Sequence, residues 1–286
     1  MPLREAPAGT VTALSIEAVD ADGALLRLRA ALASTDSAVV ALSGGVDSAV
    51  VLAAAAGVVP RLLAATGTSV AYAPEDLEAA RQIAARLGVE HVHLPTRETT
   101  DPRYAVNSPQ RCFFCKTELY GKLRELAAAR SLVALLDGTN ASDLTDFRPG
   151  LRAADEIGVR SPLREAGLHK AEVRAIAKLL GLPVWDKPAS PCLASRFPYG
   201  EAITAEKLTM VAAAERHLRA LGFRDLRVRH HGNVARIEVP AVDMAPLLAH
   251  ADHVVAALKA IGYVYVAMDL QGLRSGALNE ALPNLI

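Results

Sequence analysis

Residues 39–48 read VVALSGGVDS, and this stretch decides the fold. It starts as a short apolar, β-branched run, which predicts a buried strand, and after two glycines it enters the apolar residues 49–56, which predict a helix. A Gly-rich turn before a helix makes an anion site, because the backbone can approach a phosphate and the first helical N–H groups point at it. Ser43 and Ser48 add hydroxyl donors, whereas Asp47 is expected to hold a cation or to cap the helix.

The stretch is not a Walker loop, since no Gly-Lys-Ser/Thr stands at the required spacing. SGGVDS instead resembles the pyrophosphate loop of the ATP-pyrophosphatase (PP-loop) families, and a plain glycine turn is the alternative. The resemblance implies that ATP is cleaved between its α- and β-phosphates, that a substrate is adenylated and that pyrophosphate leaves. We expect ATP and Mg²⁺ to be held by Ser43, Gly44, Gly45, Asp47 and Ser48, with Asp47 as the Mg²⁺ ligand, and by Ser69, Gly138 and Arg148 from later loops.

Composition restricts the class of protein. The 286 residues suffice for two modest domains or one large one, and 51% of them are hydrophobic. Lys plus Arg and Asp plus Glu both number 31, so net charge gives no reason to expect nucleic acid or an anionic membrane. No run is long enough for a transmembrane helix and no signal peptide is evident, so we expect a cytoplasmic protein. Three cysteines, an odd number, argue against a secreted disulfide framework.

The order of predicted elements indicates a parallel α/β sheet. Predicted strands at 61–67 and 90–94 flank a predicted helix at 74–87, and a fourth strand follows at 133–136. Ligands of such sheets bind beyond the carboxyl ends of the strands. We place a domain boundary near Gly200, which gives a PP-loop domain over residues 1–200 and a smaller α+β domain over 201–286. The elements expected in the second domain are a helix at 204–221, a hairpin of 226–230 and 234–239, a helix at 244–261 and a strand at 263–268.

The three cysteines are candidates for chemistry. Cys112 and Cys115 form a CxxC motif ahead of a helix predicted at 116–129, and Cys192 lies in a proline-rich loop. Both loops are expected on the carboxyl side of the sheet, so the thiols can meet. Three thiolates can hold a [4Fe-4S] cluster with one iron open to another ligand. A zinc site, a redox dithiol and inert buried thiols are the alternatives.

Arginines form a second candidate site. Arg196 follows Ser195 directly, and Arg227 and Arg229 lie two residues apart, so they share one face of a strand. Facing guanidinium groups suit phosphate or carboxylate in bidentate geometry. A solvated strand face is the alternative for Arg227 and Arg229.

Several stretches together resemble the LarE family of ATP-dependent sulfur transferases. They are SGGVDS, DGTN at 137–140, FRPG at 147–150, SRFPYG at 195–200, RVR at 227–229 and LQGLRSG at 270–276. The likeness runs in order from about residue 38 to 282. It implies a PP-loop fold and the adenylation of pyridinium-3,5-biscarboxylic acid mononucleotide. A sulfur nucleophile then forms the thiocarboxylates of the nickel-pincer nucleotide.

The resemblance also implies site residues and partners. Some members of the family give up the sulfur of a single cysteine, at a position where this chain has Pro191. The other kind uses three cysteines and a [4Fe-4S] cluster that carries hydrosulfide, and this chain matches it. The expected partners are the mononucleotide, sulfide or a sulfur donor, and further copies of the chain in a homo-oligomer; from the composition, neither a membrane nor nucleic acid is expected. The implied catalytic and iron-sulfur residues are Cys112, Cys115 and Cys192, and the implied substrate-binding residues are Ser195, Arg196, Glu215, Arg227 and Arg229.

Two other interpretations remain open at this point. The first is a different PP-loop enzyme, either a tRNA thiolase or an amide synthase. A tRNA thiolase usually needs a basic surface, against which the net charge of zero argues weakly. An amide synthase would not need the three cysteines. A non-catalytic ATP-binding assembly protein would bind ATP without releasing pyrophosphate. The three are distinguished by whether pyrophosphate appears with the mononucleotide, with tRNA or with neither.

Overall fold

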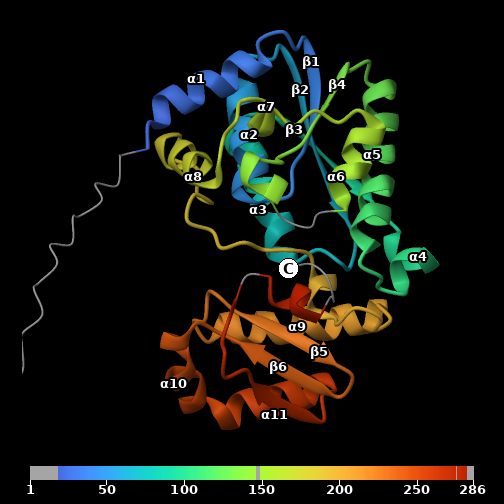
Figure 1. Ribbon diagram of the computed structural model, residues 1–286, viewed down its shortest axis with the longest axis vertical. Helices are drawn as coiled ribbons and strands as arrows, with labels where there is room; N and C mark the ends of the chain where they lie inside the picture. Colours follow the sequence, from blue (N-terminus) through green and yellow to red (C-terminus); the bar gives the residue numbers. More distant parts are fainter. Residues whose placement is uncertain (1–18, 146–148, 275, 282–286) are drawn as a thin grey trace, which may run out of the picture.

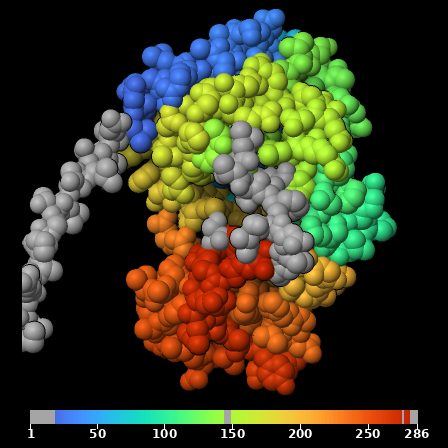
Figure 2. Space-filling view, in the orientation of Figure 1, coloured from blue at the N-terminus to red at the C-terminus, as the bar shows by residue number. Residues whose placement is uncertain are grey.

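The computed structural model describes residues 19–145, 149–274 and 276–281, which form two sheets with their helices (Figure 1). The N-terminal sheet is entirely parallel, in the order β3-β2-β1-β4, which confirms the predicted α/β fold. Figure 2 shows the C-terminal half, orange to red, directly beneath the N-terminal half. The parallel strands are β1 Ser37–Ala41, β2 Arg61–Thr68, β3 Glu90–Pro95 and β4 Ala134–Leu136.

The first strand lies inside the parallel sheet because it is apolar on both faces. Val40 pairs in register with Ala64 of β2 and Leu136 of β4. Val39 and Val40 are both fully buried but join different hydrophobic clusters, as alternating residues of a strand must. The cluster of Val40 includes helices α1 Ala21–Leu32, α2 Val46–Ala56, α3 Pro74–Arg86, α7 Pro162–Glu165 and α8 Lys170–Leu179; the cluster of Val39 includes α5 Arg111–Ala129 and α6 Gly150–Ile157.

The CxxC motif lies inside a helix rather than before one. After β3 come η1 Glu98–Thr100 and α4 Pro102–Ala105, and α5 already begins at Arg111. The prediction of a helix starting at residue 116 was therefore wrong. The chain turns at Ser108, whose carbonyl oxygen accepts from the Arg111 N–H at 3.0 Å, so the helix is nucleated before the cysteines. Cys112 and Cys115 consequently lie one helical turn apart near the start of α5.

The C-terminal half holds a three-stranded sheet in the order β5-β6-β7. The predicted hairpin is confirmed, since β5 Arg227–His231 and β6 Val234–Glu238 are antiparallel, and β7 Tyr265–Met268 adds parallel to β6. Helices α9 Ala205–Ala220 and α11 Ala251–Ile261 pack on this sheet around a core that includes Leu218, Val228 and Leu258.

The single helix predicted at 244–261 is two helices. α10 Ala241–Ala249 and α11 meet at an angle of 85°. His250 between them has φ −100° and ψ 12°, and Asp252 then occupies the first turn of α11, where the helix dipole favours an acid. No single helix in the described ranges has the length and apolar composition to span a membrane, although this bent pair would meet both criteria together.

The junction between the halves is fastened to the segment that follows α4. Asn107 is fully buried, has φ +54°, and its side-chain amide donates to the carbonyl oxygens of Phe197 and Pro198 at 3.4 and 2.7 Å. The N–H of Gly200 donates back to the Asn107 carbonyl oxygen at 3.0 Å. The predicted domain boundary near Gly200 thus falls in a well-bonded segment, which follows the short helix η3 Leu193–Arg196.

Candidate functional site

The phosphate loop between β1 and α2 depends on Gly44. This residue has φ +76°, a conformation that favours glycine, and a Cβ built on it would lie 2.0 Å from the backbone oxygen of Asp76. The first turn of α3 therefore packs directly against the loop. Gly45 is the N-cap of α2 and has no side chain to cap the helix, so the first amides of α2 remain available to an anion.

Two serines hold the loop in shape. The hydroxyl of Ser48 accepts from the Ser43 N–H at 3.1 Å and donates to the Gly45 carbonyl oxygen at 3.2 Å. The two hydroxyl oxygens are themselves 3.1 Å apart. On the other side, a Cβ on Gly138 would lie 2.6 Å from the Ser48 nitrogen, so the segment after β4 reaches the start of α2 only because residue 138 is glycine. The structure thus brings these four predicted ATP-binding residues together.

Asp47 already has two partners. Its carboxylate accepts from the Asn140 amide at 3.0 Å and pairs with Lys170 Nζ at 2.5 Å. Magnesium is usually held by one or two carboxylates and by the phosphates of a nucleotide, so one carboxylate at the loop suits it. To bind the ion, Asp47 would have to exchange the Lys170 ammonium for it. Lys170, the first residue of α8, carries no motif that sequence reasoning could have used.

Of the two other predicted ATP-binding residues, one makes hydrogen bonds outside the loop and one lies outside the described ranges. Ser69 follows β2, and its hydroxyl donates to the buried carboxylate of Glu98 and accepts from the Ala71 N–H at 3.1 Å. Arg148 lies outside the described residues, so its role stays a prediction.

Two of the cysteines pack against a hydrophobic cluster that contains residues of both halves of the chain. Cys115 and Cys192 belong to one hydrophobic cluster with Tyr104, and the Tyr72 hydroxyl lies 3.8 Å from Cys115 Sγ. Burial raises the pKa of the Cys115 thiol well above its usual range, and Cys192 beside it raises that pKa further. Cys112 stands one turn earlier on the same side of α5. Among the described residues no three His, Cys, Asp or Glu side chains form a group that could hold a metal ion as they stand.

The predicted substrate-binding residue Arg196 is buried in an ion pair. Its Nε and Nη2 donate to the two carboxylate oxygens of Glu215 at 2.7 and 3.0 Å. Its Nη1 donates to the Pro191 carbonyl oxygen at 2.7 Å and to the Ser195 hydroxyl at 2.9 Å. Burial alone would raise the pKa of Glu215, but Arg196 and Arg219 hold it below its ordinary value. Arg196 and Glu215 therefore position each other and the Ser195 segment.

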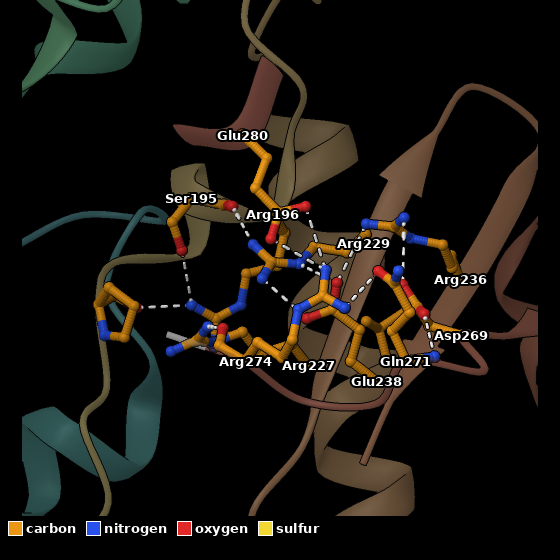
Figure 3. A network of polar contacts seen from close by, with 12 residues as sticks. Ser195, Arg196, Arg227, Arg229, Arg236, Glu238, Asp269, Gln271, Arg274 and Glu280 are labelled. Atoms are coloured by element: carbon orange, nitrogen blue, oxygen red, sulfur yellow. Dashed lines mark hydrogen bonds and ion pairs between the residues drawn. The ribbon is translucent and has the colours of Figure 1, made fainter. Parts of the chain in front are cut away.

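Arg227 and Arg229 differ although they share a strand face. Arg229 is buried, forms a bidentate pair with Glu238 at 2.9 and 2.8 Å, and donates to the Ser195 carbonyl oxygen at 2.7 Å. Arg227 donates to the Arg274 carbonyl oxygen at 3.3 Å, and within the described ranges no Asp or Glu pairs with it. Burial lowers the pKa of Arg227 to about 10, and Arg229 and Arg196 contribute. Figure 3 shows these guanidinium groups lying close together beside Ser195.

A cavity of about 300 Å³ lies where these groups meet the N-terminal half. Its wall is formed by the start of α3, by residues 187–190, by the segment around β5 and by Leu273 and Arg274. Six cationic and three acidic residues line the cavity, so its lining carries an excess of positive charge. An anionic ligand would relieve the repulsion between the cations. The cations are Lys187, Arg196, Arg219, Arg224, Arg227 and Arg274.

Comparison with known proteins decides the family. The asparagine synthase family matches residues 27–109, which include the phosphate loop. The pyridinium-3,5-bisthiocarboxylic acid mononucleotide synthase of Lactiplantibacillus plantarum is 39% identical over 89% of this chain and 93% of its own length. The chain belongs to this LarE family. The resemblance noted in the sequence is thereby confirmed.

Two further relatives differ in how much of the chain they match. An uncharacterised protein of Synechocystis is 45% identical over 90% of this chain and 97% of its own length. A tRNA-specific 2-thiouridylase of Azorhizobium caulinodans is 34% identical, but over only 58% of this chain and 53% of its own length. Similarity to the synthase and to the Synechocystis protein thus extends over about nine-tenths of the chain, whereas similarity to the tRNA enzyme covers little more than half.

Proposed function

We propose that this protein uses ATP to adenylate the carboxylates of pyridinium-3,5-biscarboxylic acid mononucleotide and converts them to thiocarboxylates for the nickel-pincer nucleotide. The observation that carries the proposal is the similarity to the synthase of Lactiplantibacillus plantarum over nearly its whole length. The position of a cation-lined cavity beside a phosphate loop supports it, because the substrate and ATP are both anionic.

In the first step the substrate carboxylate attacks the α-phosphorus of ATP. The new bond joins the carboxylate oxygen to phosphorus, the bond between the α-phosphorus and the bridging oxygen breaks, and its electron pair leaves with pyrophosphate. The amides at the start of α2 and the Ser43 and Ser48 hydroxyls would hold the departing phosphates. Asp47 would hold Mg²⁺ against them.

The mononucleotide would bind in the cavity. Arg227 is the best candidate to contact its phosphate or carboxylate, because it reaches the cavity without a carboxylate partner in the described ranges. Ser195 would be held by Arg196 and Arg229, which contact its hydroxyl and its carbonyl oxygen. Glu215 and Glu238 fix these two arginines, so the site is preorganised by buried ion pairs.

In the second step a sulfur nucleophile attacks the acyl carbon. A carbon–sulfur bond forms, the carbon–oxygen bond to AMP breaks, and the proton of hydrosulfide is released. We propose that Cys112, Cys115 and Cys192 hold a [4Fe-4S] cluster, which would supply an open iron for hydrosulfide. In support, Cys115 and Cys192 both pack against the hydrophobic cluster that includes Tyr104, and Cys112 lies one helical turn from Cys115 on α5. Since the Cys115 thiol has a raised pKa, a metal would have to displace its proton.

Pyrophosphate release tests the first step. Protein with ATP and Mg²⁺ is assayed with the mononucleotide, with tRNA and with neither. We expect release with the mononucleotide. Release only with tRNA would assign the protein to the tRNA thiolases, and ATP binding without release in any mixture would assign it to assembly proteins.

Iron content tests the cysteines. Anaerobically purified protein is compared with Cys112→Ala, Cys115→Ala and Cys192→Ala for iron, sulfide and the visible spectrum. We expect about four irons per chain, lost in each variant. Absence of iron, together with loss of one sulfur from Cys192 after turnover, would contradict the cluster and indicate a sacrificial cysteine.

A further inference from the structure

Lys187 touches both the phosphate loop and the cavity. Its ammonium donates to the Gly44 carbonyl oxygen at 2.9 Å and pairs with the Asp76 carboxylate at 2.7 Å. The same residue lines the cavity beside Arg196 and Arg227. Its side chain is 22% exposed, so the cation is partly withdrawn from water.

The other cations at the site touch only one of the two regions. Lys170 pairs with Asp47 of the loop helix but does not line the cavity. Arg196 and Arg227 line the cavity, and the bonds described for them go to other parts of the chain than the loop. Within the described ranges, Lys187 is thus the cation that joins the loop to the cavity.

A cation at such a junction would favour adenylation. If the loop holds the β- and γ-phosphates and the cavity holds the substrate carboxylate, the α-phosphorus must lie where the two regions meet. Negative charge builds up there on the oxygens of the α-phosphate and on the bridging oxygen that leaves. A fixed cation in a site partly withdrawn from water stabilises this charge more than it stabilises bound ATP.

We propose that Lys187 contacts the α-phosphate and stabilises the transition state of adenylation, an inference that rests on the proposed function. The step needs no proton from the lysine: the carboxylate oxygen bonds to phosphorus, the bond to the bridging oxygen breaks, and its electron pair leaves with pyrophosphate. An ammonium group has three N–H donors. Two are directed to Gly44 and Asp76, which leaves the third for an α-phosphate oxygen.

The surroundings of Lys187 keep it in place before ATP binds. Asp76, in the first turn of α3, accepts from the Ser190 hydroxyl at 2.8 Å as well as pairing with Lys187. The segment 187–190 is therefore tied to α3 at both ends. Because the backbone of Asp76 also lies against Gly44, the loop, the helix and the lysine form one rigid unit.

Lys187→Met tests the proposal, with Lys207→Met as the matched control. Lys207 makes the same kinds of contact, to the Glu201 carboxylate and the Ala202 carbonyl oxygen, both at 3.1 Å, but in the C-terminal half. We expect kcat for pyrophosphate release to fall on the order of 100-fold in Lys187→Met. The dissociation constant for ATP and the melting temperature should stay close to those of the control. Lys187→Arg should recover part of kcat, because it returns the charge.

The outcomes separate the inference from the proposed function. If the wild-type protein releases no pyrophosphate with the mononucleotide, the proposed function fails. If it does, and Lys187→Met keeps the kcat of Lys207→Met, the lysine has no role in the transition state. Weaker ATP binding at unchanged kcat would also overturn the proposal, since it would make Lys187 a ground-state contact. Should Lys187→Met fold poorly, Lys187→Gln and Lys187→Arg replace it, provided that the two variants have the same melting temperature. A kcat that is much lower in Lys187→Gln than in Lys187→Arg supports the proposal, and an equal kcat overturns it.

Discussion

The phosphate loop and the arginine cluster are both suited to anions, but they are built in opposite ways. The loop spans six consecutive residues, SGGVDS, and uses backbone amides and two hydroxyls. Its Gly44 lets α3 come close, and Gly138 lets the segment after β4 come close. The arginine cluster is assembled from η3, α9 and β5, and buried carboxylates hold its guanidinium groups (Figure 3). The loop is fixed by steric exclusion: a side chain on Gly44 or Gly138 would overlap neighbouring backbone atoms. The arginine cluster is fixed by charge pairing.

This difference predicts how each site fails. A site fixed by steric exclusion should be lost when a single methyl group is added. In a site fixed by charge pairing, the arginines that hold the structure and the arginine that meets the ligand should respond differently to the same substitution.

Adding a methyl group to the loop should have the largest effect. In Gly44→Ala the Cβ would lie 2.0 Å from the Asp76 backbone oxygen, so α3 must move or the loop must open. We expect ATP binding and pyrophosphate release to fall below detection. Gly88→Ala is the control, because Gly88 also has a positive φ but a Cβ there meets nothing within 4 Å. The control should cost about 1–2 kcal/mol of stability and keep ATP binding. Normal ATP binding by Gly44→Ala would refute steric exclusion.

Removing a buried, paired arginine should reduce stability. Among the described residues, Arg229→Met leaves the fully buried Glu238 with Arg236 as its remaining ion-pair partner. We expect the free energy of unfolding, from urea titration, to fall by about 3 kcal/mol. An unchanged unfolding free energy would mean that the ion pair does not hold this part of the cluster together.

Removing the neighbouring arginine should affect binding instead. Arg227→Met disturbs no ion pair in the described ranges, so its unfolding free energy should change by less than about 1 kcal/mol. The KM for the mononucleotide should rise roughly 10- to 100-fold, the loss of one charge-assisted hydrogen bond. Equal effects of Arg227→Met and Arg229→Met on both quantities would erase the distinction between them.

The local parts of the fold could be predicted from sequence. The strand before the loop, the three further parallel strands and the β5–β6 hairpin follow from apolar periodicity and from turn residues. The break at His250 could not, because apolar spacing continues through α10 and α11, and Pro246, the residue that would signal a break, lies inside α10 instead. The early start of α5 was hidden for a similar reason: a turn hydrogen-bonded through Ser108 carries no strong composition signal.

The parts of the site that depend on pairing were less predictable. Arg196 and Glu215 could both be named, but their bidentate contact joins residues 19 positions apart on different elements, so only the structure shows that they bind each other. Lys187 was not named at all. A single lysine before a proline has no signature, and its place between loop and cavity appears only when α3 is packed against Gly44.

The junction held by Asn107 has a consequence for how a ligand enters and leaves. Asn107 holds residues 197–200 through three backbone contacts, so the chain between the two halves has little slack. Opening by rotation of the halves, which takes microseconds to milliseconds, would have to break these bonds. Rearrangement of exposed side chains takes only picoseconds to nanoseconds. Exchange at the cavity should therefore follow the motion of its more exposed cations, Arg224 and Arg274, and the distance between the two sheets should stay constant while it occurs.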